Sequence, residues 1–123
     1  MSRDAAREYI NKLSNGSTIV LFNTDNGNRG YWLARKQSQL RKAQTDDVTT
    51  GVKRGEDILS IIWYDCVQGL KYKLLDYETV VSVGSVIVTV SKIVWNKTTT
   101  SRFYLGQSVH DMLIDIIGRM SEM

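Results

Sequence analysis

Few side chains in this sequence could catalyse a reaction. The chain holds one cysteine, Cys66, and one histidine, His110. Such a pair works as nucleophile and base only when the fold brings the two together, and no local motif favours that here. Metal sites need several His, Cys, Asp or Glu ligands at fixed spacings. We therefore expect neither a metal nor a cofactor, and we expect Cys66 to be a small residue of the core.

The carboxylates and glycines also give no sign of an active site. Asp46 and Asp47 lie in a polar stretch, where no burial would tune a carboxylate for acid–base work. The glycine-bearing segment 26–30 precedes no helix, so it is not a dinucleotide-binding turn. The sequence holds neither a phosphate-binding-loop pattern nor a G-x-S-x-G elbow. We therefore expect no catalytic residues and no enzyme.

Aromatic residues beside acidic ones are the first candidates for binding. The set comprises Trp32, Trp63, Tyr64, Asp65, Tyr72, Asp76 and Tyr77. The electron-rich ring faces, with a carboxylate nearby, can hold a desolvated ammonium group with about 2 kcal/mol. Because neighbouring residues of a strand point to opposite faces, at most one of each adjacent pair can line a pocket. The alternative is that Trp32 and Trp63 fill the core of the barrel. Tyr64, Tyr72 and Tyr77 are expected to make exposed contacts.

A basic segment is the second candidate. Lysine and arginine exceed aspartate and glutamate by 16 to 13, which gives a net charge of +3. The excess is local, because only Asp46 and Asp47 oppose six cations in one stretch. These cations are Arg35, Lys36, Arg41, Lys42, Lys53 and Arg54. The segment could contact phosphates or an acidic peptide, or it could be a solvated loop.

The composition is typical of one globular domain over residues 1–123. Of these residues, 42% are hydrophobic and 24% are charged, which excludes a disordered tail and a disulfide-rich miniprotein. No apolar run approaches the roughly 20 residues of a membrane helix, so we expect no membrane partner. The lone cysteine and the lack of a secretory signal pattern predict an intracellular, reducing location.

The pattern of apolar residues predicts the elements that must position these side chains. We expect a mainly β fold, a small barrel flanked by an N-terminal and a C-terminal amphipathic helix. The helices are predicted over 2–14 and 108–120, and the barrel body over 17–105. A long polar basic loop is predicted over 37–56.

The C-terminal helix has two interpretations. Its apolar stripe comprises Val109, Met112, Leu113, Ile116, Ile117 and Met120. The stripe could close the barrel, or it could assemble subunits through Met112, Ile116 and Met120, because methionine suits adaptable contact surfaces.

The order of motifs resembles the chromatin-associated BAH and Tudor-like barrels. Over about residues 16–95 the likeness lies in Gly-Ser-Thr-Ile-Val (16–20), Tyr-Trp-Leu-Ala-Arg (31–35), Ile-Ile-Trp-Tyr (61–64), the acidic stretch 72–76 and the β-rich run 85–90. The resemblance implies an SH3/Tudor/BAH-like barrel that binds histone tails or other protein partners, in the nucleus rather than the cytoplasm. A β-rich body that ends in an amphipathic helix is also similar to pleckstrin-homology-type folds.

The sequence thus predicts a non-enzymatic interaction module that binds a protein or a histone-type peptide. Two alternatives stay open. The chain could bind DNA or RNA through the basic segment 35–54, or it could be an architectural subunit of a homo- or hetero-oligomer built through the C-terminal helix.

Overall fold

The computed structural model describes residues 3–23, 30–82, 90–93, 95–99 and 101–120, which form a mainly β fold. Helix α1 (Arg3–Lys12) precedes the strands and helix α2 (Gln107–Met120) follows them. The strands are β1 (Thr18–Asn23), β2 (Gly30–Lys36), β3 (Arg41–Lys42), β4 (Asp57–Gln68), β5 (Lys71–Leu74), β6 (Thr79–Ser82), β7 (Val90–Ile93), β8 (Lys97–Thr98) and β9 (Phe103–Tyr104). The predictions of a mainly β fold and of a C-terminal helix are therefore confirmed.

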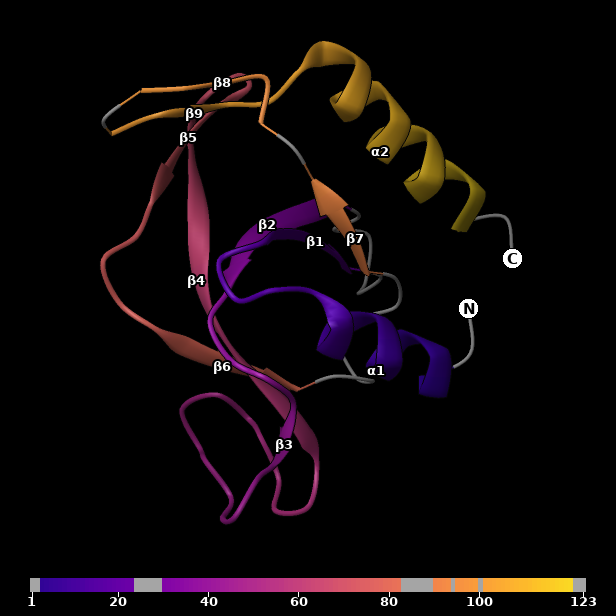
Figure 1. Ribbon diagram of the computed structural model, residues 1–123, viewed down its shortest axis with the longest axis vertical. Helices are drawn as coiled ribbons and strands as arrows, with labels where there is room; N and C mark the ends of the chain where they lie inside the picture. The colour runs from indigo at the N-terminus through magenta and orange to yellow at the C-terminus, as the bar shows by residue number, and fades with distance from the viewer. Residues whose placement is uncertain (1–2, 24–29, 83–89, 94, 100, 121–123) are drawn as a thin grey trace.

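Strand β4 is the centre of the sheet. Its sequence, rich in β-branched and aromatic residues, is typical of a long buried strand. Ile61 pairs with both β2 and β6, and Ile58 pairs with both β3 and β6. Since a residue has one partner on each side, β2 and β3 lie on one edge of β4, with β5 and β6 on the other. The antiparallel sheet runs β7-β1-β2-β4-β5-β9-β8 and curls into a half-barrel (Figure 1).

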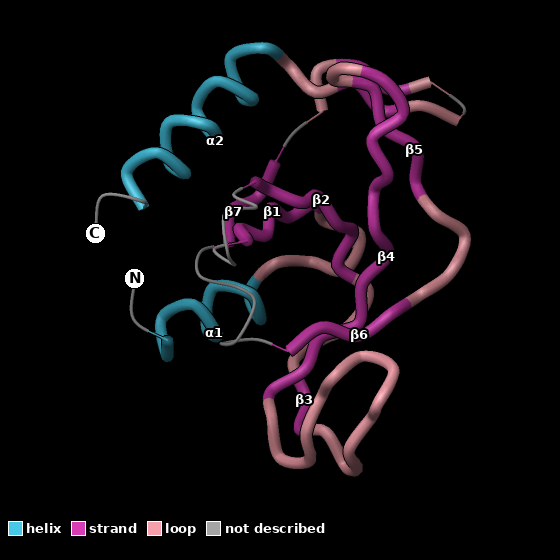
Figure 2. The backbone as a smooth tube through the Cα atoms, turned by 180° about the vertical axis from the view of Figure 1, so that it is seen from behind, coloured by secondary structure: helices cyan, strands magenta, loops and turns pink. Residues whose placement is uncertain are grey.

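The two helices cover opposite faces of the sheet. Along β1, Ile19 and Leu21 pack in one buried cluster with Ile10 of α1, while Val20 packs with Leu113 of α2 in another. Figures 1 and 2 show β1 and β2 between the two helices. Within the described residues, neither helix is long and apolar enough to cross a membrane.

The segment 37–56 is more ordered than a loop, which corrects the prediction. It contains β3 and then extends the β3–β4 pairing as a hairpin, seen below β3 in Figure 2. The Ala43 N–H donates to the Glu56 carbonyl at 2.9 Å, and the Asp47 N–H donates to the Val52 carbonyl at 2.8 Å. Ala43 and Val52 form a small apolar cluster with Ile58. Two buried apolar side chains among many polar ones gave too weak a periodicity to reveal this hairpin.

Cys66 is not a core residue, contrary to the prediction. Its thiol is free and exposed, and Sγ donates a weak hydrogen bond to the Gly69 carbonyl at 3.4 Å. Cys66 lies at the end of β4, where the pairing with β5 shifts between Cys66 and Gln68. The last four residues of β4, Asp65 to Gln68, are exposed, so the small side chain of Cys66 remains at the surface.

Lys36 is the largest fully buried side chain among the described residues, with 0% of its surface exposed. Its Nζ donates to the Leu13 carbonyl at 2.7 Å and to Asn15 Oδ1 at 3.2 Å. The Lys36 N–H also donates to the Ser17 carbonyl at 2.9 Å, and the Lys36 carbonyl accepts from the Gly16 N–H at 2.7 Å. Desolvation lowers the pKa of Lys36. The cation thus fixes the chain where α1 ends, a place at which the helix dipole favours positive charge.

Replacing Lys36 with methionine should lower the free energy of unfolding by about 1–3 kcal/mol, because the Leu13 carbonyl would lose a buried partner. Urea unfolding monitored by circular dichroism measures this change. Lys12→Met, which alters an exposed lysine of the same helix end, is the matched control and should change stability far less. Equal stability of Lys36→Met and the wild type would show that the buried ammonium is not a stabilising contact.

Candidate functional site

The predicted aromatic site is divided between the two faces of the sheet. The β2–β4 register pairs Leu33 with Tyr64 and Ala34 with Trp63. Tyr64 belongs to the buried cluster beneath α2, whereas Trp63 packs against the cluster beneath α1. Adjacent residues of a strand point to opposite faces, so Trp63 and Tyr64 cannot line one pocket.

Tyr64 and Tyr72 lie in an aromatic core and not on the surface. Both are buried, and their rings pack around Trp95, with centroids 4.8 Å and 5.5 Å from its ring. Phe103 completes the cluster, 5.0 Å from the Tyr64 ring. The Tyr64 hydroxyl also lies 3.3 Å from Thr18 Oγ1, so its polar end has a partner inside the fold. The expectation that these tyrosines make exposed contacts is therefore wrong.

Arg35 is the second cation of the basic segment, after Lys36, that does not lie in an exposed loop. Its guanidinium carbon lies 5.8 Å from the centres of the Tyr64 and Phe103 rings, and its Nε donates to the Tyr64 hydroxyl at 3.2 Å. Arg35 therefore borders the aromatic core, and Lys36 is buried beside α1. Neither residue belongs to an exposed basic loop.

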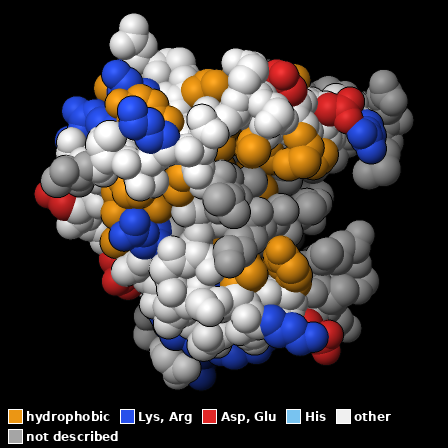
Figure 3. Space-filling model, turned by 45° about the horizontal axis from the view of Figure 1, so that its top comes forward, with side chains coloured by type: hydrophobic (Ala, Val, Ile, Leu, Met, Phe, Trp, Pro, Cys, Tyr) orange, Lys and Arg blue, Asp and Glu red, His pale blue; other side chains and the backbone are white. Residues whose placement is uncertain are grey.

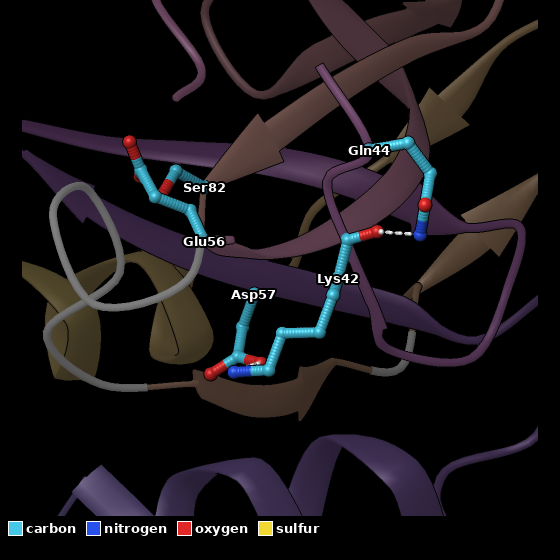
Figure 4. Close-up of polar contacts among 5 residues, drawn as sticks. All are labelled: Lys42, Gln44, Glu56, Asp57 and Ser82. Carbon is cyan, nitrogen blue, oxygen red and sulfur yellow. Dashed lines mark hydrogen bonds and ion pairs between the residues drawn. The ribbon is translucent and has the colours of Figure 1, made fainter. Parts of the chain in front are cut away.

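The remaining cations of the segment are balanced by carboxylates. Arg41, Lys42, Lys53 and Arg54 are exposed, and Asp46, Asp47, Glu56 and Asp57 lie in the same stretch. Figure 4 shows Lys42 paired with Asp57, at 2.7 Å, and Glu56 facing Ser82, whose hydroxyl donates to it. The figure also shows the side-chain amide of Gln44 donating to the Lys42 carbonyl at 3.3 Å. The hydrogen bond from Ser82, followed by that from the Lys53 N–H, lowers the pKa of Glu56.

A different group of side chains gathers on the uncovered part of the sheet. We call it the aromatic–basic face, and it comprises Trp32, Trp63, Asp65, Lys71, Lys73, Lys97 and Tyr104. The strand registers place these residues on one face, because Asp65 pairs with Lys73, and Tyr104 pairs with both Lys71 and Lys97. Trp63 lies two residues before Asp65 on β4 and therefore shares its face. Ala34 of β2 pairs with Trp63, and Trp32, two residues before Ala34, shares that face as well. Trp32 is 51% exposed.

One row of this face carries a ring between two cations. The Nζ atoms of Lys71 and Lys97 lie 5.7 Å and 5.8 Å from the centre of the Tyr104 ring. Among the described residues, no carboxylate forms an ion pair with Lys71, Lys73 or Lys97. Figure 3, which brings this end of the molecule forward, shows Lys and Arg side chains bordering a hydrophobic and aromatic patch at the upper left. The row is a cationic surface with an aromatic centre.

Sequence reasoning missed the lysines and Tyr104 because the row is assembled from three separate segments. The alternation of Lys71, Tyr72, Lys73 and Leu74 indicates a strand with one polar face. Strands β8 and β9 are only two residues each, however, and no periodicity can be read from two residues. Only the register brings Lys97 and Lys71 to either side of Tyr104.

The other predicted residues lie elsewhere. Asp76 and Tyr77 are exposed in the turn between β5 and β6, with Tyr77 59% exposed. On α2, Ile116 packs against the core together with Leu113, while Met112 is exposed; the side chain of Met120 lies outside the described residues. Since the described stripe is turned largely toward the sheet, the helix closes the fold. Nowhere in the described part of the chain do three His, Cys, Asp or Glu side chains gather as metal ligands would.

A polar chain of two tyrosines and a histidine joins α2 to the sheet. The Tyr31 hydroxyl lies 2.6 Å from His110 Nδ1 and 3.5 Å from the Tyr72 hydroxyl. Burial raises the pKa of both Tyr31 and Tyr72. The folded state thus holds these two protons more tightly than the unfolded chain does.

The sign of the pH dependence follows from these raised pKa values. The stabilisation is complete below the ordinary tyrosine pKa of 10.0 and is lost as the pH rises above it. We expect the free energy of unfolding, measured by urea titration, to fall as the pH rises above about 10, and to fall less steeply in Tyr72→Phe. For Tyr77→Phe, at an exposed position, the free energy of unfolding should fall with pH as steeply as it does for the wild type. The same steepness in all three proteins would contradict this assignment.

The arrangement thus gathers aromatic rings and lysines on one sheet face, and none of these lysines forms an ion pair with a carboxylate of the described residues. No family model, no curated protein and no solved structure matches the chain. What the aromatic–basic face can bind must therefore be argued from its own side chains.

Proposed function

We propose that this chain is a non-enzymatic binding module that binds nucleic acid on the aromatic–basic face. The observation that carries this proposal is the row in which Lys71 and Lys97 flank the ring of Tyr104, with no ion-pair partner among the carboxylates that the structure describes. Lysines without a carboxylate partner can neutralise phosphates and release the cations condensed on the nucleic acid, and this release drives most non-specific binding to nucleic acid.

The distribution of charge favours this face over the basic hairpin. The hairpin, residues 41–57, carries four cations and four carboxylates, and one of its lysines is committed to Asp57. The aromatic–basic face carries three lysines and one carboxylate, Asp65, which pairs in register with Lys73. Positive potential therefore extends outward from β5 and β8 and not from the hairpin.

The aromatic residues also favour nucleic acid over an acidic peptide. An acidic peptide would be held by the ammonium groups alone, whereas a base also offers a flat surface to Tyr104. A pocket for a histone-type peptide was expected from Trp63, Tyr64 and Tyr72, and these rings lie on opposite faces of the sheet. The likeness to BAH and Tudor-like barrels and the nuclear location stay predictions.

The salt dependence of binding tests the proposal quantitatively. With three lysine–phosphate contacts, the association constant for a labelled mixed-sequence 20-mer should fall about 20- to 40-fold between 50 and 200 mM salt. The double variant Lys71→Glu/Lys97→Glu should bind more weakly and should lose only about threefold over the same range, since one contact remains. Fluorescence anisotropy measures both quantities.

The matched control is Lys53→Glu/Arg54→Glu, which reverses two exposed charges on the hairpin and should leave affinity and salt dependence near those of the wild type. If this control loses binding while the Lys71/Lys97 variant keeps it, the nucleic acid binds the hairpin and our site is wrong. A wild-type protein that does not bind at 50 mM salt, or that binds poly-glutamate equally well, would refute nucleic acid as the ligand.

A further inference from the structure

Two indoles, one exposed and one half-buried, extend the aromatic–basic face beyond the lysine row. Leu33 pairs with Tyr64, so one step further along the register Trp32 lies opposite Asp65. Trp63 is on the same face, two residues from Asp65, and is half-buried. Half of the Trp32 surface is exposed, although an indole would be stabilised by burial in the core. A large apolar ring that the fold leaves uncovered is typical of a contact surface.

The rings and the lysines occupy different strands of one continuous surface. From Trp32 to Lys97 the face crosses β2, β4, β5, β9 and β8 in order. Neighbouring strands are about 4.8 Å apart, so the face measures about 19 Å along the sheet. That length suits a short extended segment of several nucleotides, near the lower end of the sites found on small β-sheet binding domains.

The placement of charge on this face distinguishes its two ends. Lys71 and Lys97 surround Tyr104 at one end. At the other end Asp65, the only carboxylate of the face, lies between the indoles and Lys73. A phosphate is repelled by Asp65 and attracted by the lysines, so the backbone of a bound strand is expected near β5, β8 and β9. Its bases are then the parts free to reach the indoles.

We propose that the aromatic–basic face binds single-stranded nucleic acid, with one unpaired base stacked on Tyr104 between Lys71 and Lys97 and further bases on the indoles of Trp32 and Trp63. This inference rests on the function proposed above and specifies its ligand. In a duplex the bases stack on one another and their flat surfaces are closed to a protein side chain. An unpaired base exposes its flat surface to any ring, whatever its identity, so recognition should depend little on sequence.

The experiment compares four labelled probes: a 12-mer RNA, the matching DNA, a DNA strand of the same length without bases, and the DNA duplex. The three single strands carry the same number of phosphates. Stacking contributes enough per base that the intact single strands should bind at least about fivefold more tightly than the baseless strand. Tyr104→Ala should lose at least about fivefold in affinity for the intact strands and almost nothing for the baseless strand. Tyr104→Phe keeps the ring and should bind as the wild type does.

Trp32→Ala provides an independent test, because the exposed indole can be removed with little effect on the core. It should weaken binding of the intact strands without changing the salt dependence. Indole fluorescence of the wild type should be quenched by the intact strands and not by the baseless one. Tighter binding of the intact single strands than of the duplex would support a single strand, and a preference for RNA over DNA would show that the 2′-hydroxyls contribute.

Two results would overturn the inference in different ways. If all four probes bind equally and the Lys71/Lys97 variant still loses its salt dependence, the face binds phosphates without stacking, so the single-strand inference fails while the proposed function stands. If no probe binds at 50 mM salt, both fail together.

Discussion

Backbone pairing along both edges of β4 is the constraint on which the rest of the structure depends. Twelve residues of one strand hold four partners, β2 and β3 on one edge and β5 and β6 on the other. Strands twist relative to their neighbours, so a sheet in which one long strand serves two pairs of shorter ones curls along its length. Each face of this curled sheet carries its own large apolar cluster, one packed against Ile10 of α1 and the other against Leu113 of α2.

The face of the sheet that packs against α1 is therefore buried along one part of β4 and exposed along another. Under α1 it is core, with Leu59 and Ile61 buried against Ile10. A few residues further along β4 the helix no longer covers it, and the same face carries Trp63 and then Asp65 at the surface. The proposed binding surface continues the core face beyond the reach of a ten-residue helix. The opposite side of the strands that carry it packs beneath α2.

Local pattern was sufficient to predict much of the fold from the sequence. The apolar, β-branched run 57–64 predicts a strand and the periodic stripe of α2 predicts a helix. Both elements occur at these places, although β4 continues to Gln68 beyond its apolar run. The site was not predictable in the same way. Whether Trp63 or Tyr64 faces solvent depends on which face of the sheet each helix covers. The sequence of one strand does not show which of its two alternating sets of side chains will be covered. Likewise, nothing local distinguishes Lys36, with its buried ammonium, from the half-buried Arg35 and Gln37 beside it.

Strand β8 illustrates how a residue of the proposed binding face can also prevent self-association. Among the described strands it ends the sheet, and it has two residues, one of which is Lys97. An open edge of a sheet invites the backbone of another copy to pair with it, and short strands and lysines are the usual means of preventing such aggregation. A substitution that removed the charge of Lys97 would therefore expose an unprotected edge. Selection for solubility would then act on the same side chain as selection for binding.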